Sequence, residues 1–145
     1  MLGVLNVFRA TIDPMVERQS GDQVFLGSVA GRAVYPGGNV YCASKYAVRA
    51  LYESARLDLF TTDVRVTSVD PAQVRTDFSQ VRFKGDQERA TAVYADMVPL
   101  EPEDVAEAIA WAVSRPPHVN VGEIVLWPTR QASVTHFDRR PTTPE

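Results

Sequence analysis

Histidine and cysteine are scarce in this 145-residue chain, which has two histidines and one cysteine. A single cysteine excludes a disulfide within the chain and fits a reducing compartment. Two histidines and one cysteine at scattered positions do not form the ligand set of a zinc site. The sequence therefore supports neither a disulfide-stabilised fold nor a metal site.

Long apolar runs and an excess of basic residues are also missing. No stretch approaches the roughly 20 apolar residues that a membrane-spanning helix needs, and the first residues lack the basic start and cleavage site of a secretory signal. The net charge is −3 with a pI near 5.4, which does not indicate nucleic acid or an anionic membrane as a partner. We therefore expect a cytoplasmic protein.

The apolar pattern that is present predicts one α/β domain. Hydrophobic residues make up 45% of the chain and charged residues 23%, which is ordinary for a globular protein. Apolar spacing predicts helices at 2–18, at about 39–60 and from Pro102 to Pro116, and strands at 24–26, 64–69 and 123–127. Strands that alternate with helices are typical of a parallel sheet with right-handed crossovers.

Local signals refine these boundaries. Pro14 is expected to kink or shorten the end of the first helix, and residues 19–22 are expected to form a turn. Residues 64–69 alternate with period two, and Asp70-Pro71 should end that strand. Residues 72–99 are charged, weakly periodic and too long for a simple connection, which predicts a functional loop or lid. We divide the chain into a body at 1–128 and a loose polar tail at 129–145.

Three side chains with complementary chemistry stand at a suggestive spacing. Tyr41 and Lys45 lie one helical turn apart, and Ser28 follows the first strand, 13 residues before Tyr41. A tyrosine has a pKa of about 10, so bringing it near 7 takes roughly 4 kcal/mol, much of which a neighbouring ammonium group can supply. The set could transfer a proton to or from a carbonyl or alcohol. A Tyr-x-x-x-Lys spacing alone also occurs by chance on many helices.

The set resembles the active-site pattern of the short-chain dehydrogenase/reductase family, a serine followed by Tyr-x-x-x-Lys. The resemblance implies that Tyr41 exchanges a proton with the substrate oxygen while Ser28 holds that oxygen by a hydrogen bond. It further implies that Lys45 tunes Tyr41 and that Tyr41 and Lys45 contact a cofactor, NADP or NAD. A hydrolase based on Ser28 is a weaker alternative, because no Gly-x-Ser-x-Gly motif surrounds this serine.

A second motif follows the second strand. Residues 71–76 are similar to the family's Pro-Gly-x-Val-x-Thr segment, which implies that Pro71, Val74 and Thr76 also bind the cofactor. Ala72 replaces the glycine, and if this position needs a positive φ, alanine costs about 1 kcal/mol or more. A structural turn is the alternative role for Thr76.

Longer segments are similar to one branch of the family, which oxidises 3-hydroxy acids such as serine with NADP. They are Tyr35–Tyr41, Phe78–Asp86 and Pro102–Val105, and the similarity covers most of residues 1–128. In this interpretation the region of Arg82 and Lys84 could lie beside an anionic substrate, although a solvated charge cluster explains it equally well. In relatives the helices that match 2–18 and 39–60 form subunit contacts, which implies a homodimer or homotetramer.

The family's cofactor site opens with a strand, a glycine-rich turn and a helix, and no such unit occurs in this sequence. The position of the family's catalytic asparagine would fall immediately before Met1. We therefore expect the C-terminal portion of a Rossmann-type sheet, with an unpaired apolar edge at 24–26, that is inactive and does not bind the cofactor alone. The alternative is a non-catalytic fragment or interaction module that dimerises with itself or with a complete homologue.

Overall fold

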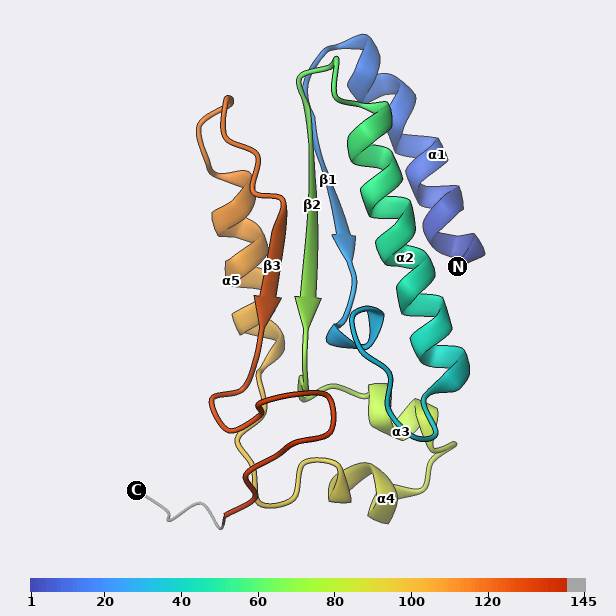
Figure 1. Ribbon diagram of the computed structural model, residues 1–145, viewed down its shortest axis with the longest axis vertical. Helices are drawn as coiled ribbons and strands as arrows, with labels where there is room; N and C mark the ends of the chain where they lie inside the picture. The colour runs from blue at the N-terminus through green and yellow to red at the C-terminus, as the bar shows by residue number, and fades with distance from the viewer. Residues whose placement is uncertain (141–145) are drawn as a thin grey trace.

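Three parallel strands form the sheet of the computed structural model, which describes residues 1–140 (Figure 1). They are β1 (Gly21–Leu26), β2 (Val64–Pro71) and β3 (Glu123–Leu126), in the spatial order β1-β2-β3. The helices are α1 (Leu2–Glu17), α2 (Asn39–Asp58), α3 (Phe78–Arg82), α4 (Gln87–Ala92) and α5 (Pro102–Val113), with a 3-10 turn η1 at Val29–Gly31. The predicted α/β class with a parallel sheet is confirmed.

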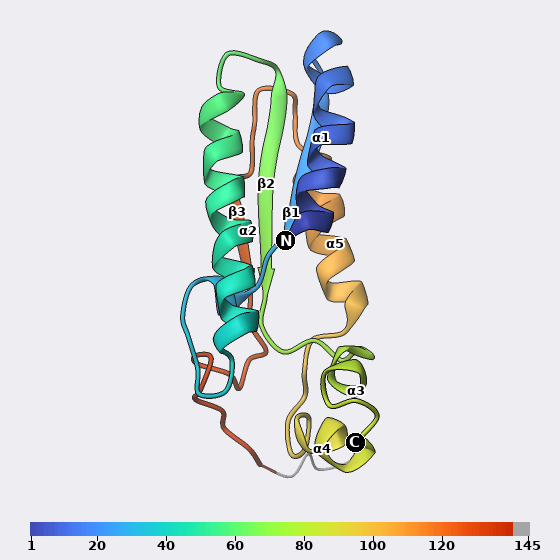
Figure 2. The same ribbon diagram turned by 90° about the vertical axis from the view of Figure 1, so that its right-hand side faces the viewer.

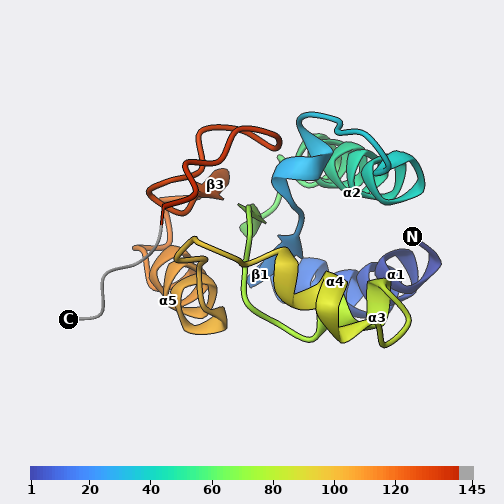
Figure 3. The ribbon, with the colours of Figure 1, turned by 90° about the horizontal axis from the view of Figure 1, so that it is seen from below.

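The helices cover both faces of the sheet. Figures 2 and 3 show α2 on one face and α5 on the other. α1 lies on the same face as α2, because Phe25 of β1 packs against both Phe8 of α1 and Tyr52 of α2. The central strand β2 is therefore buried continuously from Val66 to Asp70, although its sequence alternates with period two. The strand also continues through Asp70-Pro71, because its end pairs with β3.

Two predicted boundaries near the N-terminus are corrected by the structure. Gly21 and Asp22 belong to β1 rather than to a turn, since they pair with Val64 and Arg65 of β2. An ion pair of 2.8 Å between the Asp22 carboxylate and the Arg65 guanidinium accompanies this pairing. Pro14 does not shorten α1, which continues to Glu17.

Aromatic packing joins α1, β1 and α2. Phe25 of β1 is 3% exposed, and its ring centroid lies 5.7 Å from that of Phe8 and 6.2 Å from that of Tyr52. The apolar spacing of the segment at 39–60 favours Val48, Leu51, Ala55 and Leu59 as its packed face. Val48, Ala55 and Leu59 are buried, and Leu51 is half-buried. This cluster is the main core, and it stabilises the part of the fold that carries Ser28, Tyr41 and Lys45.

The segments at 72–99 and 129–140 lie beside the C-terminal ends of the strands (Figure 1). The predicted loop at 72–99 contains α3 and α4. Residues 129–140 differ from the loose tail that we expected, because Gln131 is buried and accepts a hydrogen bond from the backbone N–H of Gln73. The rest of that predicted tail, 141–145, lies outside the described residues. Within residues 1–140, none of the helices has both the length and the apolar character that crossing a membrane demands.

We predict that Phe25→Ala lowers the free energy of unfolding by about 3–5 kcal/mol, measured by urea denaturation, because it leaves a cavity between three elements. Phe60→Ala is the matched control, since Phe60 is 81% exposed and should change stability by about 0.5 kcal/mol or less. Equal losses in the two variants would contradict the packing described here.

Candidate active site

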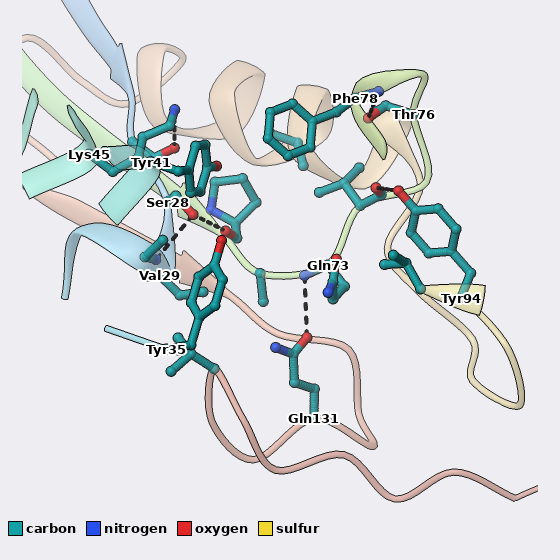
Figure 4. Close-up of a pocket in the computed structure, with 18 of the residues that line it drawn as sticks. Ser28, Val29, Tyr35, Tyr41, Lys45, Gln73, Thr76, Phe78, Tyr94 and Gln131 are labelled. Carbon is teal, nitrogen blue, oxygen red and sulfur yellow. Dashed lines mark hydrogen bonds between the residues drawn. The ribbon is translucent and has the colours of Figure 1, made fainter. Parts of the chain in front are cut away.

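A cavity of about 550 Å³ opens at the C-terminal ends of β1 and β2. Ligands of open α/β sheets bind at this end of the strands. All six residues that the sequence selected line the cavity: Ser28, Tyr41, Lys45, Pro71, Val74 and Thr76. Figure 4 shows Ser28, Tyr41 and Lys45 on one side of it, with Thr76, Phe78 and Tyr94 on the other.

Ser28 is placed by the turn that follows β1. Its Oγ accepts a hydrogen bond from the Ala30 N–H at 3.1 Å, which caps η1, and it donates a long bond of 3.4 Å to the Pro71 carbonyl. The preceding residue must be glycine, because a Cβ on Gly27 would lie 1.9 Å from the Asp70 carboxylate. The serine hydroxyl is thereby held at the junction of β1 and β2.

Lys45 joins α2 to the end of β1. Its ammonium donates to the carbonyls of Leu26 at 3.1 Å and Gly27 at 2.9 Å. A Cβ on Gly31 would lie 2.8 Å from the Lys45 carbonyl, so glycine permits η1 to approach α2 closely. Burial lowers the pKa of Lys45, and the negative charge of Asp70 opposes this effect.

Tyr41 lies between Lys45 and α3. Its ring centroid is 5.2 Å from that of Phe78 and 5.9 Å from the Lys45 Nζ. Burial raises the pKa of Tyr41 above its ordinary value of 10.0, and the neighbouring Ser28 hydroxyl and Arg82 charge oppose this rise without reversing it. The sequence led us to expect a pKa lowered by Lys45. The structure differs because the ring is desolvated and the Lys45 ammonium faces two backbone carbonyls.

An ion-pair cluster of residues that do not line the cavity joins the turn after Ser28 to β2 and β3. Asp70 is 3% exposed and accepts hydrogen bonds from Ser68 at 2.8 Å and from Arg32 at 2.7 Å. Arg32 also pairs with Glu123 of β3 at 2.5 Å.

The segment after β2 forms the second wall. Tyr94 donates to the Val74 carbonyl at 2.9 Å, and the Thr76 Oγ1 accepts from the Phe78 N–H at 3.3 Å. Ala72 does not have a positive φ, so the substitution of the family's glycine carries no strain here. Thr76 therefore takes part in a local turn and also lines the cavity.

Sequence reasoning missed residues of the C-terminal segment that line the cavity, including Gln131, Phe137 and Arg139. The side-chain carbonyl of Gln131 accepts from the Gln73 N–H at 3.2 Å (Figure 4). Its side-chain amide donates to the Ser133 carbonyl at 3.1 Å. The apolar side chains of Val134 and Phe137 within a largely polar stretch were the signal available, and both line the cavity. Arg82 also lines the cavity, whereas the exposed Lys84 does not.

Comparison with known proteins gives consistent matches. The short chain dehydrogenase family matches residues 1–87. The chain is 45% identical to an uncharacterized oxidoreductase of Mycobacterium tuberculosis over 99% of this chain and 56% of that protein. It is 44% identical to the NADP-dependent 3-hydroxy acid dehydrogenase YdfG of Escherichia coli K12, over 90% of this chain and 53% of that protein.

A solved structure shows the same fold. The closed form of a serine dehydrogenase complexed with NADP⁺ matches with a TM-score of 0.89 and 42% identity, covering 95% of this chain and 56% of that one. The chain thus spans about half the length of the relatives that it matches.

We predict that Tyr41 ionises above pH 10, because burial outweighs the two opposing influences on its pKa. The phenolate absorbance of the unaltered chain minus that of Tyr41→Phe isolates this one group, with circular dichroism as the check that both remain folded. A component that ionises below pH 10 would show that Lys45 dominates, as the sequence first suggested.

Proposed function

This chain belongs to the short-chain dehydrogenase family, and from that premise we propose that it carries the proton-transfer and substrate-holding part of an oxidoreductase. The reaction is hydride transfer between NADP and a hydroxy acid or a similar alcohol. The observation that supports this is the meeting of Ser28, Tyr41 and Lys45 in one cavity. The substrate class rests on relatives named as NADP-dependent 3-hydroxy acid dehydrogenases.

In this proposal the chain's residues move one proton and hold one oxygen. Ser28 holds the substrate oxygen by a hydrogen bond, and Tyr41 exchanges the proton with that oxygen. In carbonyl reduction, the protonated Tyr41 donates the proton as the carbonyl oxygen becomes a hydroxyl. In alcohol oxidation, the hydroxyl proton returns to an ionised Tyr41, which requires the pKa of Tyr41 to fall from its value in the chain alone.

The residues present fit one end of a nicotinamide cofactor. Lys45 uses two of its three N–H donors on backbone carbonyls, so one remains for a ribose hydroxyl. Pro71 and Val74 offer an apolar wall for the nicotinamide ring, and the Thr76 hydroxyl can donate to its amide or to a phosphate. The chemistry that bound NADP⁺ supplies is acceptance of a hydride from the carbinol carbon. No strand, glycine-rich turn and helix that would hold a pyrophosphate occurs within residues 1–140.

A second candidate, an interaction module without catalytic activity, is favoured by exposed apolar surface. β1 is an edge strand of the sheet as described, and Leu26 at its end is 55% exposed. α1 has no fully buried residue, and its Leu2 and Val7 are 77% and 59% exposed. A partner, either a second copy or a complete homologue, would cover this surface.

The catalytic proposal is tested with a chimeric protein that joins the cofactor-binding half of the E. coli YdfG to this chain. We expect NADP⁺-dependent oxidation of 3-hydroxypropionate, measured by NADPH absorbance. Tyr41→Phe should lower kcat by about 10²–10⁴-fold and leave NADP⁺ affinity nearly unchanged, because only the proton-transfer group is lost.

Tyr46→Phe is the matched control for this substitution, since Tyr46 lies on the same helix, is 41% exposed and does not line the cavity. The unfused chain should show no saturable NADP⁺ binding. Turnover that survives in Tyr41→Phe would refute the proton-transfer role of Tyr41. Micromolar NADP⁺ binding by the unfused chain would refute the expectation that this chain alone lacks a complete cofactor site.

We further predict that the chain self-associates through the helices at 2–18 and 39–60, as a dimer or tetramer. Val7→Glu should shift the mass measured by sedimentation velocity towards the monomer, because it places a charge in an apolar contact. Val34→Glu is the control, since Val34 is 69% exposed but lies outside both helices. An unaltered chain that is monomeric at all concentrations contradicts this prediction.

A further inference from the structure

Among the described residues, the wall of the cavity contains cationic side chains and no carboxylate. Lys45, Arg82 and Arg139 contribute to its wall, and none of its lining residues, all within 1–140, is an aspartate or glutamate. This contrasts with the net charge of −3 of the whole chain. A positively charged cavity in an acidic protein favours an anionic ligand.

Two of these three cations are engaged by the protein backbone. The Lys45 ammonium donates to the carbonyls of Leu26 and Gly27. The Arg139 guanidinium donates to the carbonyls of Ala95 and Val93, which fixes the C-terminal segment against the end of α4. Their donors are thus largely used for positioning.

Arg82 is held differently, by aromatic rings. Its guanidinium carbon lies 5.5 Å from the Tyr35 ring centroid, 5.9 Å from that of Tyr41 and 5.7 Å from that of Phe83. Its Nη1 donates to the Tyr35 hydroxyl at 3.0 Å, which is its one side-chain hydrogen bond among the described residues. Stacking fixes the plane of the guanidinium while most of its five N–H donors stay available.

We propose that the Arg82 guanidinium binds the carboxylate of the substrate and thereby sets a preference for hydroxy acids over neutral alcohols. This inference rests on the proposed function. A planar fork of N–H donors matches a carboxylate in bidentate geometry. In a 3-hydroxy acid one methylene separates the carboxylate from the hydroxyl-bearing carbon, so an acid bound at Arg82 has its hydroxyl near the adjacent Tyr41.

The inference is tested on the unfused full chain by NMR chemical-shift titration with two probes of similar length, 3-hydroxypropionate and 1,3-propanediol. The unaltered chain should bind the acid at least about 10-fold more tightly than the diol, which is the usual effect of one hydrogen-bonded charge pair. Arg82→Gln should bring the affinity for the acid down to that for the diol. Arg82→Lys should give an intermediate value, because it keeps the charge but loses the fork.

Lys84→Gln is the matched control. It also removes one positive charge, but from a residue two positions after Arg82 whose exposed side chain does not line the cavity. Dispersed amide spectra confirm that each variant is folded. Acid binding that survives Arg82→Gln, that falls equally in Lys84→Gln, or that is absent from the unaltered chain overturns the inference.

A third titration with inorganic phosphate separates the substrate carboxylate from a cofactor phosphate. Phosphate binding should not depend on Arg82; an equal loss of phosphate and acid binding in Arg82→Gln would overturn the assignment to substrate. The chimeric enzyme distinguishes this inference from the proposed function. If the chimeric enzyme turns over and prefers the acid equally with and without Arg82, the inference is refuted and the proposed function stands. If acid binding depends on Arg82 but the chimeric enzyme shows no turnover, the proposed function is refuted and the inference stands.

Discussion

The contact between the Lys45 ammonium and the carbonyls of Leu26 and Gly27 is the constraint on which the rest of the site depends. It fixes α2 against the end of β1, so that a residue one helical turn before Lys45 faces the turn that follows the strand. Tyr41 and Ser28 occupy those two places. The cost is a partly buried ammonium with a lowered pKa, which the charge of the nearby Asp70 moderates.

Asp70 extends this constraint across the sheet. Its carboxylate binds Ser68 on its own strand and Arg32 in the segment after Ser28, while Arg32 reaches Glu123 on β3. Charged hydrogen bonds therefore join the segment after Ser28 to the end of β2 and to the first residue of β3. One wall of the site is thus built on the sheet itself, and the opposite wall consists of short helices and a C-terminal segment attached by a few side chains.

The residues of the site that could be predicted from the sequence are those whose positions depend on spacing within one strand end and one helix. Ser28, Tyr41 and Lys45 could be placed because a strand end and a helical turn have fixed geometry. The contribution of Gln131 and Arg139 could not, since it depends on contacts with Gln73 and Val93 that are far away in sequence. The continuous burial of β2 was missed for a similar reason, because its alternating pattern does not reveal that helices cover both faces.

The charges of the cavity and the protonation of Tyr41 also bear on the direction of the chemistry. A phenol whose pKa is raised holds its proton at neutral pH, so the chain alone presents an acid to a bound oxygen. The positive charge of Arg82 is one of the influences that lower this pKa, and a carboxylate bound to Arg82 would neutralise it. Binding of an acid would thereby strengthen the hold of Tyr41 on its proton, which favours reduction of a keto acid. Oxidation would need a further positive charge beside the phenol, which the cationic ring of NADP⁺ provides when it is bound.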